Sequence, residues 1–247
     1  MRILSFSRTL TVAALLAVTT SAQAAPRAVV EAKPRAVVEL FTSPDCSACP
    51  AADALFEKLA HNPDLITLVM PVDIWDRPSR KDELALRAFN ERQMGYADRF
   101  HEGMLYTPQA MINGVLEADG SDPSEIGDAV AQTSGALSVP VQAKAAGNEV
   151  VVSVGAGNGG VSQGVITVLP YERSRSVRAH GGRITYANLV RDIVPLGSWN
   201  GKPMRSTLPL QSVAKYDGVV VLLQTGTPEQ PGAIIGATRI PLAPPKA

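Results

Sequence analysis

The stretch ELFTSPDCSACPAADALFEKL, residues 39–59, contains both cysteines of the 247-residue chain, Cys46 and Cys49. A run of apolar, β-forming residues, 37–41, precedes the pair, and apolar residues follow it at helical spacing at positions 52, 55, 56 and 59. The pattern predicts a buried strand, a turn that carries the cysteines, and a helix. A C-x-x-C pair at such a junction is typical of a redox dithiol, of half a metal site or of a small structural disulfide.

The segments that follow predict the rest of an α/β domain. Residues 64–75 form an apolar run typical of a strand buried on both faces, and residues 77–100 show charged, helical periodicity. Two short strands are expected around the Asn113-Gly114 turn, and a closing helix is expected to begin at Asp122-Pro123. The order β-α-β-α-β-β-α predicts a mixed sheet, built from βαβ plus a β-hairpin and a helix, over residues 25–137.

The sequence changes character after about residue 138. Short apolar runs such as GVITVLP and GVVVLLQ are separated by glycine, proline and asparagine. This pattern is typical of an all-β domain, and we expect a sandwich-like fold of roughly six to eight strands over residues 138–247.

The first 24 residues have the pattern of a secretory signal peptide. Arg2 and Arg8 precede an apolar stretch, 10–18, and the small residues at positions 22 and 24 suit a signal peptidase. The apolar stretch is shorter than the about 20 residues that a membrane-spanning helix needs, and a retained anchor is the alternative. We therefore expect residues 1–24 to be removed, leaving a periplasmic or secreted protein with no membrane association.

The composition argues against a nucleic-acid partner. The whole chain has 23 basic and 23 acidic residues, and removal of the signal with its two arginines leaves 21 basic residues against 23 acidic ones. The sequence contains no cluster of lysine and arginine. Because nucleic-acid binding needs a basic patch, we expect no such partner.

The C-x-x-C pair suits thiol chemistry better than it suits stabilisation. A helix N-terminus favours an anion, so a thiol placed there is more reactive as a thiolate. We expect Cys46 to attack a disulfide and Cys49, one turn later, to resolve the mixed disulfide. Closing so short a loop removes little chain entropy, so a purely structural disulfide here would add little stability.

Metal binding is the alternative for the same two cysteines. Structural zinc needs four ligands, and the three histidines, His61, His101 and His180, are scattered along the chain. Copper(I) needs only two or three soft ligands, so Cys46, Cys49 and His101 are an alternative set for that ion. Neither a metal nor any other cofactor is predicted for the protein.

Two further features are those of a thioredoxin-like fold, in which a cis-proline and a buried acid lie near the C-x-x-C pair. Thr107-Pro108 comes just before a predicted strand, and proline is the residue for which a cis bond costs little. Glu39 precedes Cys46 by seven residues in the apolar strand, and a buried Glu39 would act as a base toward Cys49. The alternatives are an ordinary turn proline, and a glutamate that faces solvent or pairs with Arg35.

Asp73, Trp75 and Asp76 follow the second predicted strand, beside the expected rim of the active site. We expect these residues to shape a binding surface. The alternative is that the aspartates cap the following helix, where a carboxylate accepts hydrogen bonds from the unpaired N–H groups of the first turn. The tryptophan would then fill the core.

Several motifs together resemble the exported proteins of domain-of-unknown-function family 1223. They are VVELFTSPDCSACPAADALFEKLA, VDIWD, YTPQAMING and GGRITYANLVRDIVPLGSWNG, within about residues 36–243. The resemblance implies a thioredoxin-like N-terminal part followed by a β-rich part, and it matches the family's motifs to Cys46, Cys49, Thr107, Pro108, Asp73, Trp75 and Asp76. Its C-terminal signature matches Arg183, Tyr186, Asn188 and Arg191. Relatives often have a histidine where this chain has Pro71, so no role of that histidine is carried over.

These features predict a periplasmic thiol-disulfide oxidoreductase that uses the Cys46–Cys49 dithiol/disulfide pair. Its partners would be protein or small-molecule thiols and disulfides, together with a second redox partner that recycles the pair. The alternative is a non-catalytic interaction protein, or a copper(I) carrier, that keeps the thioredoxin-like fold as a scaffold.

Overall fold

The fold is described by a computed structural model of residues 33–79, 81–100, 104–158, 160–179 and 182–242. These residues fall within one compact unit, residues 32–247. The predicted signal peptide, residues 1–24, lies outside the described residues. None of the helices in the described ranges combines the length and the apolar character that crossing a membrane requires.

The elements up to the third helix follow the order β-α-β-α-β-β-α that the sequence predicts. They are β1 (Ala36–Thr42), α1 (Cys49–Leu59), β2 (Leu65–Pro71), α2 (Arg87–Phe100), β3 (Gln109–Ile112), β4 (Leu116–Asp119) and α3 (Pro123–Gln132). Together with the strands that follow, they make the chain a mixed α/β protein rich in β-sheet, which confirms the expected class at that level.

The second helix is shorter than predicted. It begins at Arg87, and the described residues between 77 and 86 form turns and loop instead of helix. Asp82 gives the local reason, because its Oδ1 accepts a hydrogen bond from the backbone N–H of Leu84 at 2.9 Å. Such short side-chain contacts to the backbone compete with the hydrogen bonds of a helix.

The hairpin and the closing helix form where the sequence places them. Asn113 and Gly114 have positive φ angles of 49° and 64°, as a tight hairpin turn between β3 and β4 requires. Asp122 caps α3, since its carboxylate accepts from the backbone N–H groups of Ser124 at 2.7 Å and Glu125 at 3.1 Å.

β1 lies at the centre of the first half of the large sheet. It pairs in parallel with β2 along its whole length, from Ala36↔Leu65 to Thr42↔Pro71, and antiparallel with β3. β3 in turn pairs antiparallel with β4. The order β2-β1-β3-β4 therefore places the end of β1, from which the cysteine turn leaves, between two neighbouring strands.

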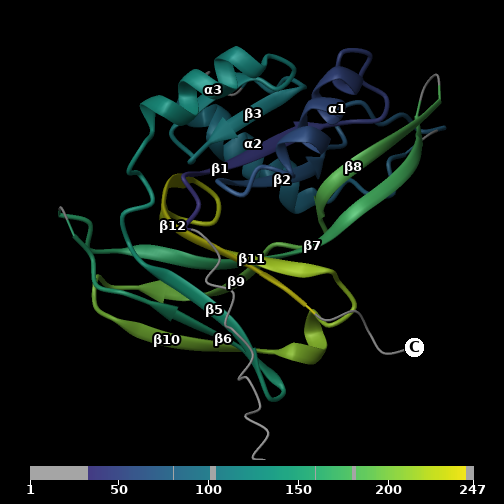
Figure 1. Ribbon diagram of the computed structural model, residues 1–247. Helices are drawn as coiled ribbons and strands as arrows, with labels where there is room; N and C mark the ends of the chain where they lie inside the picture. The colour runs from purple at the N-terminus through teal and green to yellow at the C-terminus, as the bar shows by residue number, and fades with distance from the viewer. Residues whose placement is uncertain (1–32, 80, 101–103, 159, 180–181, 243–247) are drawn as a thin grey trace, which may run out of the picture. The chain divides into compact units, whose positions relative to one another are not determined.

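The second half of the chain is built of strands, with one short 3-10 helix among the described residues. The elements are β5 (Val141–Ala146), β6 (Glu149–Val154), β7 (Gly164–Ala179), β8 (Gly182–Val190), β9 (Val194–Trp199), β10 (Met204–Pro209), η1 (Leu210–Ser212), β11 (Gly218–Gly226) and β12 (Pro231–Pro241). The large sheet has the order β12-β11-β7-β8-β2-β1-β3-β4, with β9 paired to β7 (Figure 1).

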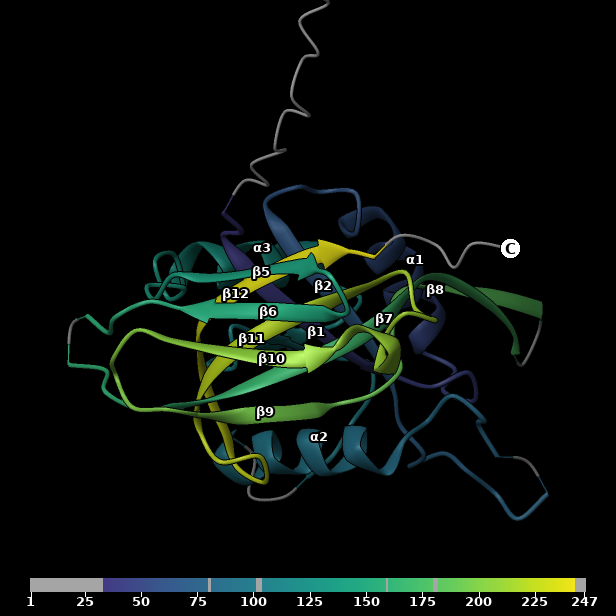
Figure 2. The ribbon, with the colours of Figure 1, turned by 90° about the horizontal axis from the view of Figure 1, so that it is seen from below.

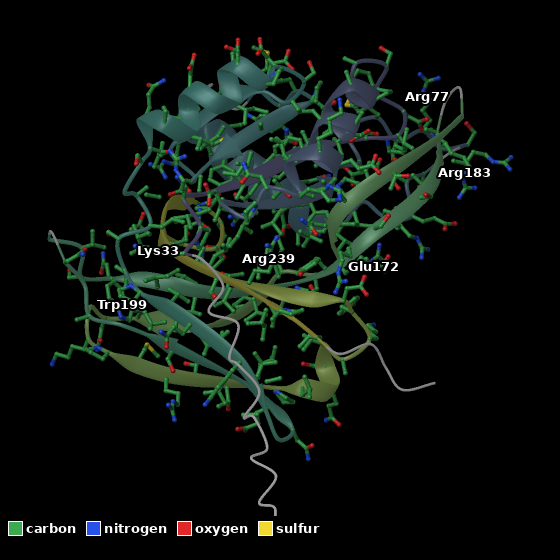
Figure 3. All side chains as sticks on the ribbon, viewed as in Figure 1. Lys33, Arg77, Glu172, Arg183, Trp199 and Arg239 are labelled. Atoms are coloured by element: carbon green, nitrogen blue, oxygen red, sulfur yellow. A yellow bond between two sulfur atoms is a disulfide. The ribbon has the colours of Figure 1, made fainter. Side chains whose placement is uncertain are left out.

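β5, β6 and β10 form a separate antiparallel sheet of three strands, which Figure 2 shows from below. One apolar cluster joins its valines to β7, β9, β11 and β12 of the large sheet. Trp199, labelled in Figure 3, is the largest fully buried side chain of this cluster, and its Nε1 donates to the carbonyl oxygen of Gly155 at 3.1 Å. The small sheet therefore packs face to face on part of the large one.

β7 is the longest strand and has two sets of neighbours. Its first half pairs with β11 and β9, whereas its second half pairs with β8. This second half and β8 form an arm, which we call the β7–β8 arm; Figure 3 labels Glu172 and Arg183 on it. The arm reaches β2 through the parallel pair Val69↔Leu189. Strands from both sides of the boundary predicted at 137/138 thus share one sheet, and the division into two domains stays a prediction.

The two faces of the central strands carry different apolar cores. In β1, Val38 and Leu40 belong to a cluster with α1 and α3, whereas Val37 and Phe41 belong to a cluster with α2, β7 and β11. Successive side chains of a strand point to opposite faces of its sheet. This alternation decides which helix each side chain of β1 meets.

Candidate functional site

Cys46 and Cys49 form a disulfide just after β1. Cys46 lies in the turn before α1 and the helix begins at Cys49, so the expectation that Cys46 stands at the helix N-terminus is corrected. Pro50 follows in the first turn of α1, where a proline costs no helical hydrogen bond. Cys46 keeps 3% of its surface exposed and Cys49 keeps none. Both cysteines are therefore buried, and the little surface that the pair exposes lies at Cys46.

The Thr107–Pro108 peptide bond is cis, as the sequence predicts, and it lies beside the disulfide. The carbonyl oxygen of Thr107 is 3.7 Å from Sγ of Cys46. A disulfide sulfur carries no proton, so this is a contact in the oxidised protein and an acceptor for the Cys46 thiol once the pair is reduced. The fold thus brings together the two cysteines and the Thr107-Pro108 dipeptide.

Trp75 reaches the same site from the loop after β2. Its indole Nε1 donates to Oγ1 of Thr107 at 2.8 Å, and 42% of the residue is exposed. The alternative that Trp75 fills the core is therefore wrong. Ile74 and Met104 are also exposed, at 38% and 70%, so the segments that lead to Trp75 and Thr107 present apolar side chains to solvent.

Asp73 and Asp76 hold the loop that carries Trp75. The backbone N–H of Asp73 donates to Oδ1 of Asn90 at 3.2 Å, and the amide of Asn90 donates back to the carboxylate of Asp73. Oδ1 of Asp76 accepts from the backbone N–H of Asp82 at 3.0 Å. Neither aspartate caps α2 at its first residue, and their predicted role in binding stays a prediction.

Glu39 is fully buried, on the face of the sheet opposite α1. Both of its carboxylate oxygens accept from Arg92 of α2, at 2.8 and 3.0 Å, and the hydroxyl of Tyr96 donates to Oε2 at 2.7 Å. Arg92 also donates to Oε1 of Gln224 in β11 at 3.0 Å. Glu39 therefore pairs with Arg92 instead of Arg35, and its expected role as a base toward Cys49 stays a prediction.

Asp53 is a candidate that the sequence reasoning missed. It lies one helical turn after Cys49 on the buried face of α1 and is 3% exposed. Oγ1 of Thr42 donates to its Oδ1 at 2.8 Å, whereas its Oδ2 has no hydrogen-bond partner among the described residues. Burial raises the pKa of Asp53 to about 7, and the hydrogen bond from Thr42 opposes the rise. The signal in the sequence is an acid between apolar positions 52 and 56, four residues after Cys49.

Tyr186 brings the β7–β8 arm against α1. It is fully buried in the apolar cluster of α1, and its hydroxyl has no hydrogen-bond partner in the described parts of the chain. Burial, followed by the carboxylates of Asp53, Asp82 and Asp45, raises the pKa of this hydroxyl far above its usual range. A residue of the C-terminal signature thus belongs to the apolar cluster that α1 shares with β1.

A groove of about 330 Å³ begins at the cysteine turn and extends to the β7–β8 arm. Basic and acidic side chains both line it, so it has no single sign of charge. The lining residues are Pro44, Asp45, Lys81, Asp82, Glu83, Leu84, Arg175, Ser176, Val177 and Arg178. The groove offers a polar surface beside the turn that carries Cys46.

The described parts of the chain contain no group of three or more Cys, His, Asp or Glu residues arranged to hold a metal ion. His61, just after α1, contacts the carbonyl oxygen of Glu57 through Nδ1 at 2.8 Å. His101 and His180 lie outside the described residues. The alternative copper(I) set of Cys46, Cys49 and His101 therefore stays a prediction.

Fold and site together define a mixed α/β protein with a buried C-x-x-C disulfide between a central strand and a helix. The chain belongs to the family described as protein of unknown function DUF1223, whose family model matches residues 37–224. No curated protein matches the chain significantly.

Two solved structures are similar to this chain. Protein AGR_C_4864 of Agrobacterium tumefaciens, a structural genomics target, is 35% identical, with a TM-score of 0.77 over 87% of this chain and 97% of its own. HBP35 of Porphyromonas gingivalis is 13% identical, with a TM-score of 0.57 over 87% of this chain and 78% of its own. The second likeness concerns the fold alone.

Proposed function

We propose that the protein is an exported, thioredoxin-like thiol-disulfide oxidoreductase whose Cys46–Cys49 pair cycles between dithiol and disulfide. The observation that carries the proposal is a buried C-x-x-C disulfide whose small exposed surface lies at Cys46, with the carbonyl oxygen of Thr107 3.7 Å from the Cys46 sulfur. We assign attack on the substrate to Cys46, the less buried of the two, and resolution of the mixed disulfide to Cys49.

The arrangement of the first half supports the thioredoxin-like description. A C-x-x-C between β1 and α1, a sheet order β2-β1-β3-β4 and a cis-proline just before β3 are its features. For the second half we propose a sandwich-like domain, supported by the packing of the three-stranded sheet on β7, β11 and β12. Export is supported by the signal-like pattern of residues 1–24.

In the reducing direction the thiolate of Cys46 attacks a substrate disulfide. A bond forms between the Cys46 sulfur and one substrate sulfur, and the other substrate sulfur leaves as a thiolate. Cys49 then attacks the Cys46 sulfur, the Cys46–Cys49 bond forms, and the second substrate thiolate leaves. Two electrons pass from the dithiol to the substrate, and the thiols of a recycling partner restore the dithiol. Oxidation of a substrate dithiol is the same sequence in reverse.

The surface around Cys46 supports protein or small-molecule thiols and disulfides as substrates. Ile74, Trp75 and Met104 expose apolar area near the Thr107 side of the site, which favours contact with a polypeptide. The charged groove on the Asp45 side favours polar or zwitterionic thiols. The roles of Thr107 and Pro108 are to border the attacking sulfur, and Trp75 positions Thr107 through its indole hydrogen bond.

Turnover of insulin disulfides or of a model disulfide, with a dithiol as the reductant, tests the proposal. We expect the wild-type protein to turn over many times and Cys46→Ser to lose activity, whereas Cys49→Ser should form a mixed disulfide and stop. Equal and negligible rates for the wild-type protein and Cys46→Ser would reject the proposal that the protein is an enzyme. A stoichiometric copper(I) titration that is lost in Cys46→Ser would then favour the carrier instead.

A further inference from the structure

We infer that Asp53 is the group that takes the proton from the Cys49 thiol when Cys49 resolves the mixed disulfide. The inference rests on the proposed function, because it concerns one step of dithiol chemistry. It also moves that role to α1, since the sequence assigned it to Glu39 of β1.

Asp53 and Cys49 are neighbours on α1. Asp53 follows Cys49 by four residues, and side chains at this spacing in a helix are neighbours, with about 5–6 Å between their Cβ atoms. Both residues are on the buried face of α1. Their polar groups are therefore within the reach of a direct contact or of one bridging water.

One carboxylate oxygen of Asp53 is left without a hydrogen bond among the described residues. Oδ1 accepts from Thr42 at 2.8 Å, but Oδ2 is buried without a hydrogen-bond partner among the described residues. Buried polar atoms nearly always have a partner, so an exception calls for an explanation. An oxygen that receives a proton during the reaction explains why no fixed donor occupies it.

The groups around Asp53 bring the titration of its carboxyl close to neutral pH. Burial raises its pKa to about 7 and Thr42 of β1 lowers it. Tyr186 of β8 faces it as a neutral phenol, and β2 contains no ionisable residue. Asp45 and Asp82 act on Tyr186 from the cysteine turn and the loop before α2. Near pH 7 the carboxyl is thus divided between its two forms, as a general base requires.

Glu39 lies on the opposite face of the sheet from α1. Its neighbours Val38 and Leu40 point toward the cluster of α1, so the side chain of Glu39 points toward α2. Both of its oxygens are engaged by Arg92, and one also accepts from Tyr96. Because Glu39 lies on the other face of the sheet from Cys49 and both its oxygens have partners, we assign it a structural role.

The step balances without an added reagent beyond the substrate disulfide. Cys49 gives its proton to Oδ2 of Asp53, and the new thiolate attacks Cys46. The Cys46–Cys49 bond forms while the bond between Cys46 and the substrate sulfur breaks. The substrate leaves as a thiolate with the electron pair, and Asp53 later returns its proton to solvent.

Stopped-flow reaction of the reduced protein with dithiobis(nitrobenzoate) separates the two steps, because each releases one coloured thionitrobenzoate. The first release reports attack by Cys46 and the second reports resolution by Cys49. For the wild-type protein we expect the second rate to rise with pH through about 7, as Asp53 ionises. In Asp53→Asn the second rate at pH 7 should fall by about 100-fold, the lower range for a general base, with the first rate unchanged.

Two variants keep the test independent of any folding defect in Asp53→Asn. Thr42→Val keeps the carboxyl but removes the hydrogen bond that lowers its pKa, so the inflection of the second rate should move to higher pH. Glu57→Gln is the matched control, since it makes the same acid-to-amide change on the exposed face of α1 and should change neither rate.

The assignment is overturned if the second rate has the same pH profile in the wild-type protein, Asp53→Asn and Thr42→Val. It is also overturned if Glu39→Gln, and not Asp53→Asn, removes the inflection. A wild-type protein that releases no thionitrobenzoate would instead reject the proposed function, so the two failures are distinguishable.

Discussion

At the level of residues, the site is a buried disulfide with the Thr107-Pro108 dipeptide beside it and the buried carboxyl of Asp53 one helical turn after Cys49. The turn with Cys46 and Cys49 before a helix is predictable because it depends on local sequence, and the cis bond before Pro108 is predictable from its place in a thioredoxin-like order of elements. The buried acid on α1 is not, because whether Asp53 faces water or protein depends on β8, which arrives more than 120 residues later.

Asp53 predicts a pH dependence of stability. Its pKa is about 7 in the folded protein and near 3.8 in the unfolded chain, so protonation favours the fold. The contribution is complete below about pH 4 and is lost as pH rises through 7. Urea unfolding of the oxidised wild-type protein should therefore show a loss of up to about 4 kcal/mol over this range that Asp53→Asn lacks. Parallel pH profiles for the two proteins would contradict the raised pKa.

At the level of elements, the position of the β7–β8 arm could not be predicted from the sequence. Apolar patterning predicts strands in this region, but it does not say that β8 lies against α1 and beside β2 in the large sheet (Figure 1). β8 pairs in parallel with β2 at Val69↔Leu189, between strands far apart in the chain, and it also packs on α1. The first residue of α2 could not be predicted for another reason. Asp82 forms local turns inside a segment of helical periodicity.

Tyr186 tests the packing of this arm. Its ring is fully buried on α1 and its hydroxyl has no partner among the described residues. Tyr186→Phe removes only the unsatisfied hydroxyl, so the protein should keep or gain stability, by up to about 1 kcal/mol. Tyr186→Ala leaves a cavity and should cost about 3–5 kcal/mol. Thermal unfolding measures both, and a large loss in Tyr186→Phe would show that the hydroxyl is bonded in solution.

At the level of the whole molecule, the two halves of the chain share an apolar core and are joined by a hydrogen bond from a buried ion pair. Arg92 of α2 binds Glu39 of β1 and Gln224 of β11, so it joins strands from both sides of residue 138. Composition marks the change to an all-β sequence there. Composition does not indicate that Arg92 joins the two halves, because an arginine in a segment of charged, helical periodicity is expected to face solvent.

Removal of Arg92 should therefore destabilise both halves together. Arg92→Ala leaves the carboxylate of Glu39 buried without its partner, which typically costs about 3–5 kcal/mol. Arg87→Ala is the control, because it breaks an exposed pair with Glu91 that is worth less than about 0.5 kcal/mol. A single unfolding transition should move in Arg92→Ala. Two transitions, of which only one moves, would show that the halves fold as independent domains.

We expect the Cys46–Cys49 disulfide to be redox-active and not structural. Equilibration of the protein in glutathione or dithiothreitol buffers, followed by trapping of free thiols and mass spectrometry, measures its reduction potential. We predict a reversible two-electron transition at a potential above about −300 mV, the range of labile and catalytic disulfides. A pair that stays oxidised in buffers poised below about −300 mV would identify a structural disulfide and contradict the account.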